Sequence, residues 1–309
     1  MHMPTTSPRH RDIIRADYWR ELCPELSVTG GMSTAPEMVA ISDQRIAELR
    51  RRMALEGYVV VPGMLSADTC QNLATGIQRV VDAGFPAPFA AVFDEYWQLA
   101  GQFRPLICGM VGEDARISAD FWMWCVDGVT EATGWSPHRD ASTAIHKPSG
   151  GALPVMTLWI PFTDVDSHNG CISVLPKQHD PNLPNAEPGK DIPMDALPYV
   201  RALHGRAGDL MCWDMEILHW GGVHTPHAKA PRVSFGFYAQ STSIPPIGGG
   251  YYAPEQLPDF DTRLATIFNM ILKYQGIWYE FPEDLMAIGR KITLVQQLVQ
   301  RQKLGNGHE

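Results

Sequence analysis

A histidine and an aspartate stand two residues apart in the segment GWSPHRDAST, as His138 and Asp140. In an extended chain, side chains at this spacing leave the same face, so these two point together while Arg139 points the other way. An imidazole and a carboxylate on one face can bind the same metal ion, and a second histidine from another strand would complete a facial triad with open coordination positions. An H-x-D pair by itself, however, is more often a hydrogen-bonded pair at the surface.

The candidate for the third ligand is His219, which ends the strand-like segment AGDLMCWDMEILH. His224 follows in the glycine- and proline-rich segment GGVHTPHAKAP; solvent exposure is its simpler interpretation, and a role as rival ligand stays open. Asp209 follows a glycine in a turn signal, so we expect a structural role for it.

A strand with one polar face follows in RVSFGFYAQ. Period two puts Val233, Phe235 and Phe237 on one face, and on the other Arg232, Ser234, Tyr238 and Gln240. A buried guanidinium needs a partner, because leaving it unpaired is costly. Arginine pairs with a carboxylate through two parallel hydrogen bonds, and a serine hydroxyl can add a third. We therefore expect Arg232 and Ser234 to hold the far carboxylate of a 2-oxo dicarboxylic acid that chelates the metal.

Two further residues, Thr157 and Trp159, share one face of the strand-like segment TLWIPF. Core packing is the simpler interpretation of both. Contact with the bound oxo acid is the alternative, and we carry it forward as a prediction.

The composition limits the partners of the protein. The 309 residues carry a formal net charge of -9 and a pI near 5.6, which disfavours a nucleic-acid partner. The six cysteines show no regular spacing, and the sequence contains neither a signal-peptide core nor a run of about 18 apolar residues. We expect a cytoplasmic protein that acts on a small molecule, without a membrane partner, and leave a homodimer open.

The order of the predicted elements indicates the fold class. A helix capped by Ser42 and ended by Gly57, a strand at 58–61 and a helix from Ser66 or Asp68 precede short strands between residues 120 and 240. We predict a mainly β protein with flanking helices and a double-stranded β-helix core of the jelly-roll or cupin-like kind. Residues 1–40 would form an N-terminal arm, 41–250 the jelly-roll domain, and 251–309 a helical extension packed on it.

Several blocks, in this order, resemble the phytanoyl-CoA dioxygenase family of iron(II)- and 2-oxoglutarate-dependent oxygenases. They span roughly residues 45–240 and read LEGYVVVPGMLSADTC, PHRD, TLWIPFTDVDSHNGCISVLPKQH, AGDLMCWDMEILH and RVSF. The resemblance implies that Arg232 anchors 2-oxoglutarate and that the iron ligands are His138, Asp140 and His219. The chain departs from the family pattern at Pro137, where tryptophan or leucine is frequent, and at His224, where a small residue or asparagine is usual.

With Fe(II), 2-oxoglutarate and O2, the expected activity is oxidation of an unactivated C–H bond with release of succinate and CO2. Hydroxylation is the expected outcome, and desaturation, cyclisation or epimerisation are alternatives on the same chemistry. Halogenating relatives have a small residue in place of the carboxylate, so Asp140 disfavours halogenation. Two rival classes remain, namely a cupin-like isomerase or hydrolase that uses zinc or another divalent metal without 2-oxoglutarate, and a binding module without catalysis.

The substrate is expected to be a small, largely apolar metabolite from secondary metabolism. Residues 85–103 concentrate aromatic side chains just before the barrel, and we predict that they wall or cover the metal site, with plain core packing as the alternative. This stretch has no cluster of lysine or arginine, so a CoA thioester with its phosphates fits poorly.

Overall fold

Two antiparallel sheets form the centre of the protein in a computed structural model that describes residues 10–29, 38–129, 134–140, 153–183, 192–247, 250–276 and 281–305. The larger sheet has the order β1 (Tyr58–Val61), β6 (Leu210–Asp214), β3 (Val155–Pro161), β8 (Arg232–Gln240), β2 (Arg116–Val126), β9 (Tyr251–Tyr252). The smaller sheet has the order β5 (Arg201–Leu203), β4 (Ile172–Leu175), β7 (Leu218–Gly221). This arrangement confirms the predicted mainly β, jelly-roll class.

The apolar pattern of the segment AGDLMCWDMEILH suggested one strand, but the structure divides it. It forms β6 and then, after a turn, β7 in the other sheet. The turn is fixed by Asp214, whose carbonyl accepts from the amide of Ile217 at 3.0 Å and whose side chain accepts from the amide of Glu216 at 3.2 Å. His219 is therefore placed opposite the larger sheet.

The predicted N-terminal helices of the domain are confirmed with their caps. The Ser42 hydroxyl accepts from the amide of Arg45 at the start of α2 (Asp43–Glu56), which ends at Gly57 with φ 84°. Ser66 caps α3 (Ala67–Asp82) in the same way. The other helical elements are η1 (His10–Ile14), α1 (Ala16–Leu22), η2 (Ala87–Val92), α4 (Asp94–Gln102), α5 (Arg104–Met110), η3 (Lys177–His179), η4 (Met194–Tyr199), α6 (Phe260–Tyr274) and α7 (Glu283–Gly305).

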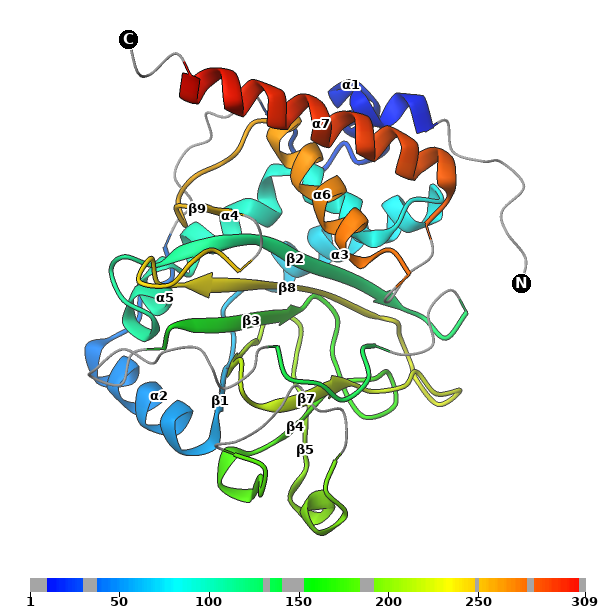
Figure 1. Cartoon of the computed structure of the whole chain (residues 1–309). Helices are drawn as coiled ribbons and strands as arrows, with labels where there is room; N and C mark the ends of the chain where they lie inside the picture. Colours follow the sequence, from blue (N-terminus) through cyan, green and yellow to red (C-terminus); the bar gives the residue numbers. More distant parts are fainter. Residues whose placement is uncertain are drawn as a thin grey trace.

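Helices cover one face of the larger sheet, and the smaller sheet lies on its other side (Figure 1). The helices η2, α3 and α6 pack against β2, and α6 also packs against η2 and α7. Within the part of the chain that the structure describes, no helix combines the length and the apolar character needed to cross a lipid bilayer.

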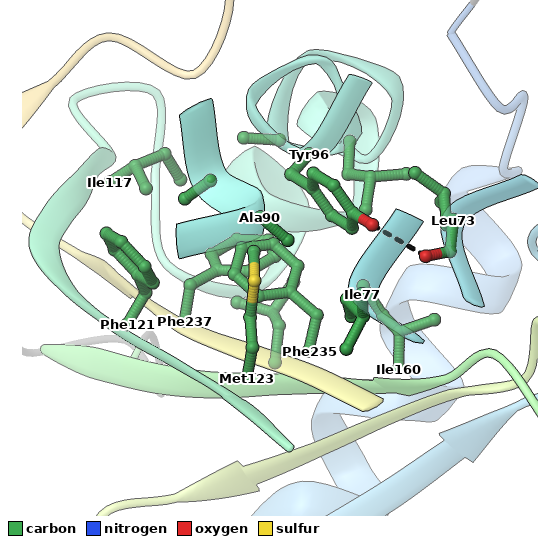
Figure 2. Packing of buried hydrophobic residues seen from close by; sticks show 14 of the residues in the cluster. Leu73, Ile77, Ala90, Tyr96, Ile117, Phe121, Met123, Ile160, Phe235 and Phe237 are labelled. Carbon is green, nitrogen blue, oxygen red and sulfur yellow. Dashed lines mark hydrogen bonds between the residues drawn. The ribbon is translucent and has the colours of Figure 1, made fainter. Parts of the chain in front are cut away.

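Alternation along β8 separates the two faces of the sheet. Val233, Phe235 and Phe237 belong to the large apolar core under the helices, whereas Arg232 lines a pocket on the opposite face. Figure 2 shows the helix side of this core, where Phe235 and Phe237 lie beside Tyr96, whose hydroxyl donates to the carbonyl of Leu73 at 2.6 Å.

The prediction that residues 85–103 wall the metal site is wrong. Phe89 and Phe93 are fully buried in the apolar core, and Tyr96 contacts Phe235 edge-on at 6.0 Å between ring centroids, on the helix side of the larger sheet. The stretch is buried because the apolar face of the larger sheet must be covered by another layer of the fold. The alternative of plain core packing accounts for these aromatic residues.

We predict that Phe89→Ala destabilises the protein by about 3–5 kcal/mol, because it leaves a cavity in the core where Phe89 packs between Trp19 and Phe268. Urea unfolding measures the change, and Leu55→Ala at an exposed position of α2 should change the free energy of unfolding by less than about 0.5 kcal/mol. The folded fraction of Phe89→Ala should bind metal normally. Weakened metal binding at unchanged stability would instead indicate that residues 85–103 do contact the metal site.

Candidate metal centre

The three predicted metal ligands come together between the two sheets. His138 lies in the segment before β3 and forms an antiparallel bridge with His219 of β7, each amide donating to the other's carbonyl at 3.0 Å. Asp140 Oδ1 is 3.5 Å from His138 Nε2 and 3.6 Å from His219 Nε2. One donor atom from each of the three residues lies within 4.8 Å of the others, which is close enough for a single ion to bind all three.

Backbone carbonyls orient both imidazole rings. His138 Nδ1 lies 2.7 Å from the carbonyl of Ser136, and His219 Nδ1 lies 3.1 Å from the carbonyl of Ile217. A carbonyl accepts only from a protonated nitrogen, so each Nδ1 carries the hydrogen and each Nε2 presents its lone pair toward Asp140. Outer hydrogen bonds of this kind fix the tautomer and the ring direction of metal-binding histidines.

Three strands of the larger sheet hold the Asp140 carboxylate. Its Oδ2 accepts from Thr157 Oγ1 of β3 at 2.8 Å and from Trp213 Nε1 of β6 at 3.1 Å. Its Oδ1 accepts from the Tyr238 hydroxyl of β8 at 3.2 Å. The carboxylate is thereby fixed in direction, with Oδ1 facing both histidines.

The protonation states suit a divalent cation. Burial opposes ionisation of Asp140, but His219 and His138, together with the hydrogen bond from Thr157, outweigh it and hold the pKa of the carboxyl below its usual range. Burial lowers the pKa of His219 to about 4, against the opposing effect of Asp140. At neutral pH the site thus offers a carboxylate and a neutral imidazole, which are the forms that bind metal.

A pocket adjoins the two histidines and reaches Arg232. Its lining is rich in tryptophan and comprises Trp122, Trp124, Trp135, His138, Trp159, Ile172, Trp213, His219, Gly221 and Arg232. Arg232 is 1% exposed, and its guanidinium donates to the carbonyl of Gly170. The Ser234 hydroxyl, also buried, has no hydrogen-bond partner among the residues that the structure describes. A bound carboxylate would supply an acceptor for this hydroxyl.

Glycines allow the chain to approach the guanidinium closely. A Cβ at Gly221 would lie 2.8 Å from the Cα of Gly134 and 3.0 Å from Arg232 Nη1. A Cβ at Gly134 would lie 2.8 Å from Arg232 Nη2. Side chains at these two positions would therefore displace the arginine.

The other candidate residues have different positions relative to the pocket. Trp159 lines the pocket, whereas Thr157 bonds the carboxylate of Asp140 and is absent from the pocket lining. His224 lies outside the group of three metal-binding candidates found among the described residues, and it bridges to Asn169. Asp209 has a structural role, because its carboxylate accepts from the amides of Gly63 and Arg206, each at 2.8 Å.

Most of the aromatic lining of the pocket is not evident from the sequence. Trp122 and Trp124 alternate on β2 and pair across the sheet with Gly236 and Ser234 of β8, which puts them on the pocket face. Gly236 makes room for this arrangement, since a Cβ there would lie 2.6 Å from the Trp122 ring. Alternation in FWMWC could have placed the two tryptophans on one face, but not on the face of Arg232. That assignment depends on strand pairing.

Comparison with known proteins gives similarities in sequence and in fold. The family model "Phytanoyl-CoA dioxygenase (PhyH)" matches residues 98–230. No curated protein sequence matches the chain. Among solved structures, HygX from Streptomyces hygroscopicus with nickel and 2-oxoglutarate bound is similar at 16% identity and a TM-score of 0.53, covering 70% of this chain and 98% of its own. The 2-oxoglutarate-dependent carbocyclase SnoK from nogalamycin biosynthesis is similar at 18% identity and a TM-score of 0.50, covering 69% and 87%.

We predict that His138→Ala, Asp140→Ala and His219→Ala each abolish tight binding of a divalent metal, since two remaining ligands hold an ion poorly. Anaerobic titration with Fe(II) or Co(II) measures the affinity. His224→Ala is the control and should bind like the unaltered protein. Loss of metal by His224→Ala together with retention by His219→Ala would reverse the assignment of the third ligand.

Proposed function

Residues 98–230 match the family model of the phytanoyl-CoA dioxygenases, and from this match we infer that the protein is a non-haem Fe(II)- and 2-oxoglutarate-dependent dioxygenase. The observation that carries the inference is that one pocket is lined both by two of the candidate metal ligands, His138 and His219, and by the buried Arg232. A metal-chelating dicarboxylate fits such a pocket, because one end needs open metal positions and the other a cation.

Each residue has a distinct task in this proposal. His138, Asp140 and His219 would hold iron through two nitrogens and one oxygen, a donor set that suits Fe(II) and leaves positions for the oxo acid and O2. Bound iron would supply the oxidising chemistry, in which 2-oxoglutarate loses CO2 to become succinate with one oxygen atom of O2 and the substrate receives the other. Arg232 would pair with the distal carboxylate of 2-oxoglutarate, and Ser234 would donate to the same group.

In this proposal, the tryptophans of the pocket also exclude water. Trp135 contacts the ring of His138 at 5.4 Å and those of Trp122 and Trp124 at 5.3 and 5.8 Å between centroids, so aromatic surface lines the side of the pocket near His138. Excluding water protects a strong oxidant from side reactions. Trp159 would contact the oxo acid from β3, while Thr157 would act through Asp140.

We propose a small, largely apolar metabolite as substrate, from secondary metabolism, since aromatic side chains predominate in the described lining of the site and its arginine, Arg232, is assigned to the oxo acid. Hydroxylation is the proposed outcome. The same fold carries out ring formation in SnoK, so desaturation, cyclisation or epimerisation would need only a different fate of the substrate after C–H cleavage. A cytoplasmic location stays a prediction, and a homodimer stays open.

We predict that Arg232→Lys weakens 2-oxoglutarate binding at least tenfold, or by about 1.4 kcal/mol, because an ammonium cannot reproduce the two parallel hydrogen bonds. Titration of the Fe(II)-loaded protein under anaerobic conditions gives the dissociation constant. Arg201→Lys, on the exposed strand β5, is the matched control and should leave the constant unchanged. An unaltered affinity in Arg232→Lys would move the carboxylate anchor elsewhere.

The proposed activity is tested by adding Fe(II) and 2-oxoglutarate without oxygen and recording the visible charge-transfer band of the chelate. We expect the band, and on admitting O2 we expect consumption of oxygen with release of succinate. Metal binding without the band would favour the cupin-like isomerase or hydrolase instead. The band without succinate release on exposure to O2 would favour a binding module.

A further inference from the structure

Arg139 stands in the sequence between His138 and Asp140, and it forms a buried ion pair with Asp180. Its side chain is 2% exposed, and its Nη2 donates to Asp180 Oδ2 at 2.5 Å. Asp180 follows the short helix η3, and its other oxygen accepts from the amide of Asn182 at 3.0 Å. The Arg139–Asp180 pair thus connects the segment that carries His138 and Asp140 to a part of the chain about 40 residues away.

The same guanidinium reaches the segment that carries the third ligand. Arg139 Nη1 donates to the carbonyl of Glu216 at 2.5 Å. Glu216 lies in the turn between β6 and β7, next to Ile217, whose carbonyl orients the ring of His219. The Arg139 side chain therefore links the H-x-D segment to the turn that precedes His219.

A second cation reinforces this turn from η3. Lys177 Nζ donates to Asp214 Oδ2 and lies 3.4 Å from Glu216 Oε2. Asp214 in turn fixes the amide of Glu216. The helix η3, the β6–β7 turn and the H-x-D segment are consequently joined by charged side chains, two of which, Arg139 and Asp180, are almost fully buried.

We propose that Arg139, paired with Asp180, is a positioning residue that sets the spacing between His219 and the pair His138 and Asp140. A buried ion pair is weak evidence for stability, because desolvation offsets the attraction, so its presence beside the ligands calls for another role. Arginine suits the task, since its planar fork can bond a carboxylate and a carbonyl at fixed angles. The inference rests on the proposed function only to the extent that the three residues bind a divalent metal.

The chain offers a matched control in Arg263 and Asp94. This pair is similarly buried, with side chains 0% and 1% exposed, and its nitrogen and oxygen, Nη1 and Oδ1, are 2.5 Å apart, as are Nη2 and Oδ2 in the pair of Arg139 and Asp180. It joins α6 to α4 on the helix side of the larger sheet, and Arg263 also donates to the carbonyl of Thr29. Breaking it should disturb stability without reaching the metal centre.

The experiment compares Asp180→Asn with Asp94→Asn in the full chain. Asparagine keeps the shape of the side chain and removes its charge. We expect both variants to lower the melting temperature, because each leaves a buried guanidinium without its counter-charge. Only Asp180→Asn should weaken Co(II) binding, by roughly ten- to hundredfold, as is typical when an outer hydrogen bond of a metal site is lost. The visible ligand-field spectrum of bound Co(II) should change as well.

Arg139→Lys keeps the test decisive if Asp180→Asn does not fold. Lysine keeps the charge beside Asp180 but cannot provide the fork to Glu216, so it should fold and still bind Co(II) more weakly than the unaltered protein. Co(II) affinity and spectrum equal to those of the unaltered protein, in either folded variant, would overturn the proposal. Since these readouts use Co(II) alone, failure to form the 2-oxoglutarate chelate in the unaltered protein would count against the proposed function and not against this inference.

Discussion

The buried carboxylate of Asp140 is the interaction on which the site depends. Its side chain is 1% exposed, so a charge there requires donors on every side. Thr157, Trp213 and Tyr238 supply them from three neighbouring strands, and two imidazoles face the remaining direction. The carboxylate therefore ties the segment before β3 to the larger sheet, and a metal ion would complete its coordination.

The larger sheet separates structural from chemical work. Its helix-covered face carries phenylalanines of β8, among them Phe235, which contacts Tyr96 of α4 in the apolar core that buries most aromatic residues of 85–103. Its other face carries Arg232 and Ser234 of the same strand, together with two tryptophans of β2. Period two in one strand thus builds the core and the pocket at the same time, so changes on the two faces should have separable effects.

The smaller sheet packs in a separate apolar cluster, which includes Ile172, Val174 and Leu203, and it brings His219 and Gly221 into the pocket. Its position relative to the H-x-D segment is set by the backbone bridge between His138 and His219 and, from behind, by Arg139. Both contacts join residues about 80 positions apart. A metal site that spans two sheets needs such links, because the distance between ligands must be held within a fraction of an ångström.

The sequence alone determined what depends on local pattern. Alternation in RVSFGFYAQ separated Arg232 and Ser234 from the phenylalanines, H-x-D spacing put His138 and Asp140 on one face, and Ser42, Gly57 and Ser66 marked helix ends. The jelly-roll class followed from the succession of short strands.

Only the tertiary structure decided which faces meet. It broke AGDLMCWDMEILH into two strands in different sheets, turned Trp122 and Trp124 toward Arg232, and assigned residues 85–103 to the far side of the sheet. It also directed Thr157 to Asp140 and Arg139 to Asp180. These contacts join residues far apart in the chain, and periodicity specifies which side chains share a face but not what that face packs against.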